Sequence, residues 1–158
     1  MNSVLQKHLI KKYHIFFDYI KKDKGDIMLP IYFGFECGDG WYHILDTLMS
    51  SIKHHQKYKK IEPIKIKQIK EKFGTLSFYY TGGDEYIHGL VSMATSMSAV
   101  TCEDCGTTEG VGVTERRWIH VCCKDCFNKN DRLNDLKWGA NSNARIIKIS
   151  KLLKNARR

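Results

Sequence analysis

The sequence lacks several features that would place it in a familiar class of protein. No apolar stretch reaches the length of about 20 residues that a membrane-spanning helix needs. The opening segment MNSVLQKHLIKKYHIFF mixes lysines into its apolar positions and does not have the form of a signal peptide. Serine and cysteine nucleophile motifs are absent, and the GDG and GGD segments lack the lysine and glycine spacing of a phosphate-binding loop. We therefore expect a soluble cytoplasmic protein that is not an enzyme and has no membrane partner.

Acidic residues are scarce, and the resulting charge is unevenly distributed. The chain has 26 Lys and Arg against 17 Asp and Glu, which gives a formal net charge of +9. Residues 127–158 carry 9 basic and 2 acidic residues, whereas residues 101–126 carry 3 basic and 5 acidic residues. A basic surface favours phosphate groups or an acidic protein face, and it excludes a protein that acts by imitating DNA.

Hydrophobic periodicity predicts a body made of helices and strands. With 158 residues and 42% apolar content, the chain can supply the core of one domain. Helical spacing predicts a helix that Ser3 caps and that continues to about Ile20, and a second helix from Trp41 that Asp39 caps. Strand-like alternation predicts a short strand before the GDG turn and a hairpin over residues 64–80 that turns at EKFGT.

A third helix is expected after Asp84, whose side chain would cap it. One face of this helix carries Tyr86, Leu90, Met93 and Met97. A stripe of methionine and aromatic residues at helical spacing is usually part of the core, so we expect this face to be buried.

The order of the elements predicts an α+β fold in which helices cover an antiparallel sheet. We assign residues 1–100 to this body and residues 101–127 to a zinc ribbon. Residues 128–158 are expected to form a linker and a basic amphipathic C-terminal helix, because apolar residues near the end of the chain alternate with lysine and arginine.

The segment CEDCGTTEGVGVTERRWIHVCCKDC holds five of the six cysteines. Cys102 with Cys105, and Cys123 with Cys126, form two C-x2-C pairs separated by 17 residues, which is the spacing of a four-cysteine zinc site. VGV and WIHVC are expected to be hairpin strands that bring the pairs together. Two disulfides are the alternative, which a reducing cytosol disfavours. Four protein ligands leave no position for water, so the predicted cofactor is a structural Zn2+.

The two remaining cysteines are Cys122 and Cys37. Side chains alternate along a strand, so Cys122 should point away from Cys123, and Cys123 is the expected ligand. A C-x3-C pair through Cys122 stays open as an alternative. Cys37 is expected to be a buried thiol.

The strongest catalytic candidate is the segment FECGDGWYHILD, at a strand-to-helix turn. It gathers Glu36, Asp39, His43 and Asp46, and carboxylates with a histidine could hold Mg2+ for phosphodiester cleavage. A cap at Asp39 and an ordinary surface pair of His43 with Asp46 explain the same residues without catalysis. No second carboxylate motif completes a site, so a metal-dependent nuclease is the weaker hypothesis.

Three parts of the sequence, ECGDGWYHILDTL, KEKFGTLSFYYTGGDE and the pair CEDCG with CCKDC, resemble small zinc-ribbon proteins encoded by bacteriophages and mobile elements. The likeness covers about residues 33–126. In overall character the chain is similar to anti-CRISPR inhibitors of type II systems, which bind Cas9. The resemblance implies a bacterial nuclease such as Cas9, with its guide RNA, as the partner in the cytoplasm of a bacterial host cell. It carries over no catalytic residue.

Two hypotheses for the function follow. In the first, exposed aromatic and arginine side chains dock on the nuclease and inhibit it. The expected contact residues are Tyr58, Arg116, Arg117, Trp118 and Trp138. In the second, the protein is a nucleic-acid-binding regulator whose basic residues follow a phosphate backbone. Those residues are Lys65, Lys67, Lys70, Lys72, Arg145, Lys148, Lys151 and Lys154. We prefer the first hypothesis because the most distinctive segment, the predicted zinc ribbon, is also the least basic.

Overall fold

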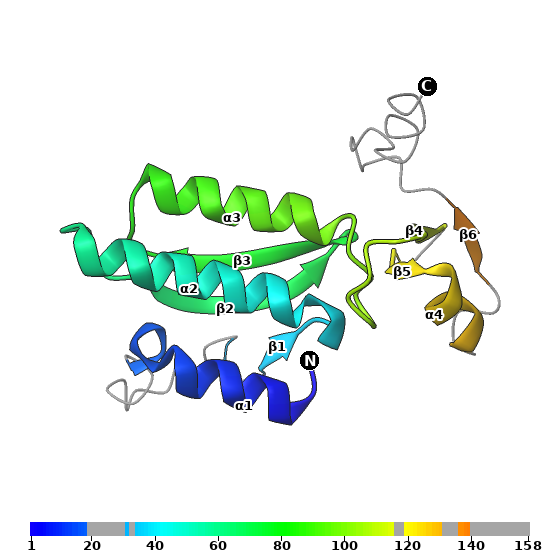
Figure 1. The fold of residues 1–158 in the computed structure, drawn as a ribbon, viewed down its shortest axis with the longest axis horizontal. Helices are drawn as coiled ribbons and strands as arrows, with labels where there is room; N and C mark the ends of the chain where they lie inside the picture. Colours follow the sequence, from blue (N-terminus) through cyan, green and yellow to red (C-terminus); the bar gives the residue numbers. More distant parts are fainter. Residues whose placement is uncertain (19–30, 32–33, 116–118, 131–135, 140–158) are drawn as a thin grey trace, which may run out of the picture.

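The fold is that of a computed structural model, which describes residues 1–18, 31, 34–115, 119–130 and 136–139. Helices packed on a sheet form one part of the molecule, and the segment with the cysteine pairs forms a second part at the end of the first (Figure 1). We call the described residues up to 100 the body, and those from 101 to 139 the cysteine module.

A three-stranded sheet of order β1-β2-β3 lies at the centre of the body. β2 (Lys65–Lys72) and β3 (Thr75–Thr81) form the predicted antiparallel hairpin. The turn between them is made by Phe73 and Gly74, whose φ angles of 54° and 77° are those that two-residue hairpin turns require.

The predicted α+β fold with an antiparallel sheet is found in part: β2 and β3 are antiparallel, but β1 (Phe35–Glu36) pairs with β2 in parallel. Parallel neighbours need a long crossover connection, usually a helix. α2 (Tyr42–Tyr58) is a helix of 17 residues between these two strands and supplies the crossover. The sheet is therefore mixed.

α2 and α3 (Glu85–Ser98) lie side by side over the sheet (Figure 1). α2 buries Leu45, Leu48, Met49 and Ile52. Ile66 and Ile69 of β2 are both completely buried although they are three residues apart, because the register shifts between Ile66 and Gln68. A bulge of this kind offsets strict alternation by one residue and keeps both isoleucines in the core.

The third helix begins as predicted, but it presents a different face to the core. Asp84 caps α3, and its Oδ1 accepts a hydrogen bond of 3.1 Å from the backbone N–H of Ile87. The residues of α3 that are buried are Ile87, Ala94 and Ser98. Ser98 stays there because its hydroxyl binds the backbone N–H of Leu76 at 2.7 Å. The stripe that we expected in the core, from Tyr86 to Met97, is largely exposed.

The first helix is shorter than predicted and has a different cap. α1 spans Ser3–Lys12, and the side chain of Asn2, not Ser3, caps it. A 3-10 helix, η1 (His14–Phe16), follows in place of further α-helical turns. The chain leaves the α-helical path at Tyr13, whose hydroxyl donates a hydrogen bond of 2.7 Å to Oδ1 of Asp46 on α2. Tertiary contact has therefore overridden the local helical pattern.

Asp46 gives this contact a pH dependence. Burial raises the pKa of Asp46, but hydrogen bonds from Lys12, at 2.7 Å, and from Tyr13 outweigh burial and hold that pKa below its usual value. A depressed carboxyl pKa contributes stability above the unfolded pKa of about 4, and that stability is lost as the pH falls through the folded pKa. Asp46→Asn should lower the free energy of unfolding by about 1 to 2 kcal/mol at neutral pH.

The measurement is urea unfolding of both proteins between neutral pH and about pH 3. The difference between wild type and Asp46→Asn should shrink towards zero at acid pH. A difference that stays constant across this range would contradict the assignment of the effect to the charged carboxylate.

The cysteine module contains a second sheet, of order β5-β4-β6, in which both pairings are antiparallel. β4 (Val111–Glu115) and β5 (Val121–Cys123) are the two strands predicted around the cysteine pairs. α4 (Lys124–Lys129) follows β5, and β6 (Lys137–Gly139) adds to β4. β6 lies in a segment that the sequence indicated only as a polar connector. The predicted basic C-terminal helix falls on residues outside the described ranges.

Candidate metal centre

Four cysteines of the module converge on one point. The Sγ atoms of Cys102, Cys105, Cys123 and Cys126 all lie within 4.8 Å of one another. All six cysteines of the chain are free, so the alternative of two disulfides is not realised. The Sγ atoms of Cys105 and Cys123 are 3.8 Å apart. Two sulfurs that each bind a tetrahedral zinc at about 2.3 Å are about 3.8 Å apart. The four thiols could therefore hold a metal ion, and their spacing is compatible with zinc.

The first pair sits on a tight turn that the backbone itself holds. The N–H of Cys102 donates to the carbonyl oxygen of Thr107 at 2.8 Å, and the N–H of Gly106 donates to that of Cys102 at 2.9 Å. Gly106 has a φ of 79°, a conformation that glycine adopts at low cost. The turn aims both thiols of the pair at the same point.

The second pair sits at the start of α4. Cys123 caps this helix, and its Sγ accepts a hydrogen bond of 3.4 Å from the N–H of Cys126. The side chain of Cys122 points away from the four-thiol cluster. Its Sγ lies close to side-chain atoms of Asp104 and His120 instead. Cys123, and not Cys122, is therefore the partner of Cys126 in the cluster.

Electrostatics favours a cation among the four thiols. Burial raises the pKa of Cys102, and burial together with hydrogen bonds from neighbouring thiols raises that of Cys126. Burial also opposes ionisation of Cys123, but the N–H of Cys126 and the adjacent thiols outweigh it and lower the pKa of Cys123. Several thiolates in one place repel one another, so their joint ionisation is favourable only with a metal ion to bind.

The turn of the first pair is docked on the body at the start of α2. The 3-10 helix η4 (Asp39–Trp41) lies there. The N–H of Gly40 donates to the carbonyl oxygen of Glu103 at 2.7 Å, and the indole N–H of Trp41 donates to that of Thr101 at 3.0 Å. A Cβ atom on Gly40 would lie 2.2 Å from the carbonyl oxygen of Cys102. The backbones of the body and the cysteine module are therefore in direct contact, and only glycine fits between them.

A second contact joins the module to the hairpin of the body. A Cβ atom on Gly74 would lie 2.8 Å from Cγ2 of Ile119 and 3.2 Å from Cγ2 of Val121. The β2–β3 turn thus packs directly against the strand that leads to the second cysteine pair. Two separate parts of the body hold the metal centre in place.

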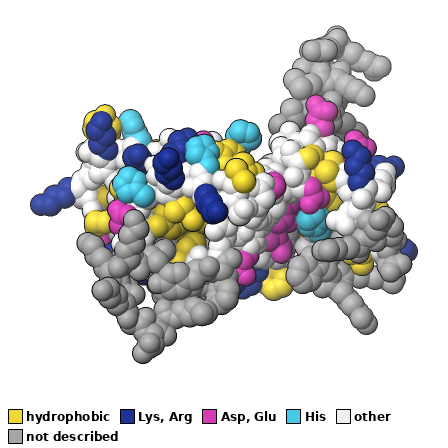
Figure 2. Space-filling model, turned by 90° about the horizontal axis from the view of Figure 1, so that it is seen from below, with side chains coloured by type: hydrophobic (Ala, Val, Ile, Leu, Met, Phe, Trp, Pro, Cys, Tyr) yellow, Lys and Arg dark blue, Asp and Glu magenta, His cyan; other side chains and the backbone are white. Residues whose placement is uncertain are grey.

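Charged side chains fill the boundary between the two parts. Figure 2 shows acidic side chains gathered where the body meets the cysteine module, with a histidine beside them. His120 lies 3.0 Å from Asp104 and 3.2 Å from Glu103, and Oε1 of Glu103 accepts a hydrogen bond of 2.8 Å from the N–H of Gly38. The hydrogen bonds to Asp104 and Glu103 raise the pKa of His120 to about 10. The imidazolium therefore balances two carboxylates at the boundary, of which Glu103 is buried and Asp104 is exposed.

The carboxylates of the catalytic candidate segment are engaged in other contacts. Asp39 accepts two hydrogen bonds of 2.6 Å from Asn2, and Glu36 accepts one of 2.8 Å from Gln68. Asp46 binds Lys12 and Tyr13, as described above. The prediction that Asp39 caps the second helix was wrong, since neither η4 nor α2 has a side-chain cap. Instead the segment supplies the surface on which the cysteine module docks, which the sequence did not reveal.

The residues proposed for partner contact lie in different surroundings. Tyr58, at the end of α2, is 65% exposed. Trp138 is half-buried against the cysteines of the module, and its indole N–H donates to the carbonyl oxygen of Cys122 at 3.0 Å. Residues 116–118, which include Arg116, Arg117 and Trp118, lie outside the described ranges.

The residues proposed for nucleic-acid binding are only partly described. Lys65 and Lys72 are exposed and Lys67 and Lys70 are half-buried, all on β2. The Nζ atom of Lys70 lies 5.4 Å from the centre of the Tyr79 ring. The residues of the predicted tail helix, which are Arg145, Lys148, Lys151 and Lys154, fall outside the described part of the chain.

No protein-family model, curated protein or solved structure matches this chain. Within the described residues, no helix has both the length and the apolar character that crossing a membrane requires.

Proposed function

We propose that this protein is a non-enzymatic inhibitor that binds a bacterial defence nuclease, namely Cas9 loaded with guide RNA, in the cytoplasm of the host cell. The observation that supports it is the docking of the cysteine module on the body through the buried backbone N–H of Gly40 and the buried indole N–H of Trp41. A surface that is held rigid before binding loses little conformational entropy when it meets a partner. The target itself is inferred from the resemblance of the sequence alone.

In this proposal the metal is a structural Zn2+ bound by Cys102, Cys105, Cys123 and Cys126. A site closed by four thiolates has no free position for water or substrate, so zinc would stabilise the module and not carry out chemistry. The basic surface would face an acidic patch of the nuclease and block a conformational step, while guide and target strands stay paired.

A nucleic-acid-binding regulator is the second candidate, and one observation favours it. Lys70 and Lys72 each lie 5.4 Å from the centre of an aromatic ring, those of Tyr79 and Phe73, and both rings are exposed. Single-stranded nucleic acid is commonly bound by lysines that contact phosphates and aromatic rings that stack on bases.

A pull-down separates the two candidates. The tagged protein is incubated with purified Cas9 and guide RNA, with and without added nuclease, and the bound species are identified by mass spectrometry. We expect Cas9 to be retained after nuclease treatment and at physiological salt, because an interface with an apolar centre depends little on salt. Recovery of nucleic acid alone, with Cas9 lost on nuclease treatment, would contradict the inhibitor proposal. Binding to phosphates should also weaken by orders of magnitude between low and physiological salt.

A further inference from the structure

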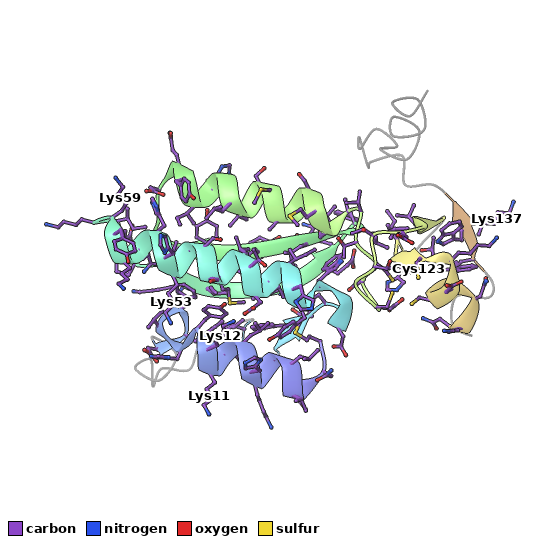
Figure 3. The ribbon with its side chains drawn as sticks, viewed as in Figure 1. Lys11, Lys12, Lys53, Lys59, Cys123 and Lys137 are labelled. Atoms are coloured by element: carbon purple, nitrogen blue, oxygen red, sulfur yellow. The ribbon has the colours of Figure 1, made fainter. Side chains whose placement is uncertain are left out.

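A second group of side chains that can bind metals lies beside the four-cysteine cluster. One potential ligand atom from each of Asp104, His120 and Cys122 lies within 4.8 Å of the other two. Asp104 belongs to the turn of the first cysteine pair, and Cys122 belongs to β5 and directly precedes Cys123. Figure 3 labels Cys123, at the junction of β5 and α4. The second group is therefore next to the four thiols but shares no side chain with them.

The backbone holds the segments that carry this group. The N–H of Glu103 donates to the carbonyl oxygen of Val121 at 2.8 Å. The N–H of His120 donates to the hydroxyl of Thr114 at 2.9 Å, and the N–H of Thr114 donates to the carbonyl oxygen of His120 at 3.0 Å. These bonds hold the turn and the strands together independently of the side chains of the group. A site placed in this way on rigid backbone loses little entropy when it binds a ligand.

The contact between His120 and Asp104 has the spacing of two ligands of one metal ion. Nε2 of His120 lies 3.0 Å from Oδ2 and 3.2 Å from Oδ1 of Asp104. A nitrogen and an oxygen that bind a tetrahedral zinc at about 2.0 to 2.1 Å are about 3.3 Å apart. A proton on Nε2 bridges the two side chains when the imidazole is charged, and a metal would displace that proton, as metals do from histidine and cysteine ligands.

Glu103 is placed to orient the imidazole. It is 5% exposed, and its Oε1 accepts a hydrogen bond of 2.8 Å from the N–H of Gly38. Its Oε2 is buried and faces Nδ1 of His120 at 3.2 Å, without a well-aligned hydrogen bond among the described residues. An imidazole that binds a metal through one nitrogen usually donates the N–H of the other to a carboxylate. A metal on Nε2 would leave the proton on Nδ1, where Oε2 of Glu103 is an acceptor within reach.

The charges around the group favour a cation. Burial raises the pKa of Glu71, and the charge of Glu103 raises it further. Glu71, Glu103 and Asp104 thus place three carboxylates around one imidazole, and an excess of negative charge favours a divalent cation. An ion pair of His120 with Asp104 alone would leave this excess uncompensated, and it gives no role to the thiol of Cys122.

We propose that Asp104, His120 and Cys122 form a second metal site, for a divalent transition metal such as Zn2+ or Co2+, and that Glu103 is its positioning residue. Imidazole, carboxylate and thiolate together suit this class of metal and not Mg2+ or Ca2+. Three protein ligands leave one coordination position open, and because Asp104 is exposed that position would hold water. The site has one thiolate where the cluster has four, so it should lose its metal on dialysis while the cluster keeps zinc. The inference is independent of the partner proposed above.

Cobalt titration of the full chain tests the second site. The protein is loaded with one equivalent of Zn2+, dialysed, and titrated with Co2+ under reducing and anaerobic conditions. Zinc binds such ligands more tightly than cobalt, so Co2+ should not displace it. We expect one equivalent of Co2+ to bind saturably, with visible d–d bands and a thiolate-to-cobalt charge-transfer band. Release of Zn2+ in place of a second bound equivalent, or the absence of saturable binding, would overturn the proposal.

Four variants test the ligand assignment. Cys122→Ala should keep its zinc but bind cobalt without the charge-transfer band. Asp104→Asn, and Glu103→Gln, which retains an oxygen acceptor for the N–H of Gly38, should each weaken cobalt binding by at least about tenfold. Asp125→Asn is the matched control, because Asp125 is an exposed carboxylate of the module outside the group, and it should bind cobalt as the wild type does. Unchanged binding in Asp104→Asn, or an equal loss in Asp125→Asn, would contradict the ligand set.

Histidine NMR of the wild type provides a readout that does not depend on the folding of a variant. Long-range 1H–15N spectra follow the ring nitrogens as Zn2+ is added beyond the first equivalent. We expect the Nε2 signal of His120 to shift and lose its proton while Nδ1 keeps its own, and the signals of His43 and His54, which are exposed on α2, to stay unchanged. If His120 keeps both ring protons at saturating Zn2+, the metal is not bound to this imidazole and the proposal fails.

Discussion

Cys105→Ser should abolish metal binding and unfold the cysteine module while the body keeps its helices. Cys105 is the exposed member of the four-cysteine cluster, so its replacement removes one of the four thiols that could hold a metal ion, with little loss of packing. Zinc binding to four such ligands contributes on the order of 10 kcal/mol at neutral pH, and a site that folds around its metal loses that stabilisation with the metal. The module itself buries few large apolar side chains, since its core consists mainly of Cys102, Cys122 and Cys123 with half-buried neighbours.

Metal analysis of the purified protein by mass spectrometry, together with near-ultraviolet circular dichroism, checks this expectation. We expect about one zinc per wild-type chain and none in Cys105→Ser. Cys122→Ala is the matched control, because Cys122 is adjacent in sequence to Cys123 of the cluster but its own Sγ lies outside the cluster. This control should keep its zinc. Loss of zinc from Cys122→Ala with retention in Cys123→Ala would overturn the ligand assignment.

Local patterns predicted those parts of the fold whose causes are local. The cysteine spacing predicted the cluster because two tight turns and a hairpin suffice to bring the pairs together. The alternation around EKFGT predicted the β2–β3 hairpin, whose turn needs only two residues of positive φ. Asp84 caps α3 through a hydrogen bond to a residue three positions along the chain, which is also visible in sequence.

The features that the sequence did not reveal depend on contacts between distant residues. Whether Met93 and Met97 or Ala94 and Ser98 face the sheet is determined by the packing of α3 against β3, and the hydroxyl of Ser98 finds its partner on Leu76. Hydrophobicity alone predicted that Met93 and Met97 would be the residues facing the core. The contact between Gly40 and Glu103 joins residues more than 60 positions apart. Gly40 lies in the GDG segment, where a turn is a sufficient local reason for glycine, so nothing in the sequence indicated this contact.

Gly40→Ala should weaken the attachment of the cysteine module to the body while it leaves the four thiols of the candidate metal site unchanged. Gly40 does not have a positive φ, so alanine meets no backbone strain, and the only obstacle is space. Its Cβ would lie 2.2 Å from the carbonyl oxygen of Cys102, 2.5 Å from the nitrogen of Gly106 and 2.7 Å from the carbonyl oxygen of Glu103. All three are backbone atoms of the turn that holds the first cysteine pair, and they cannot move independently of one another.

We therefore expect Gly40→Ala to lower the free energy of unfolding by about 3 kcal/mol, the upper part of the range for overpacking, and to expose the buried Trp41. Gly89→Ala is the control, because a Cβ atom on Gly89, in the middle of α3, would meet nothing within 4 Å, and alanine there should be stabilising by about 0.5 to 1 kcal/mol. Urea unfolding, followed by tryptophan fluorescence and zinc content, measures both variants. Because the four thiols are unchanged, Gly40→Ala should still bind zinc. An unfolding free energy equal to that of the wild type would mean that the cysteine module does not depend on this contact, and that the rigidity on which the proposed function rests has another source.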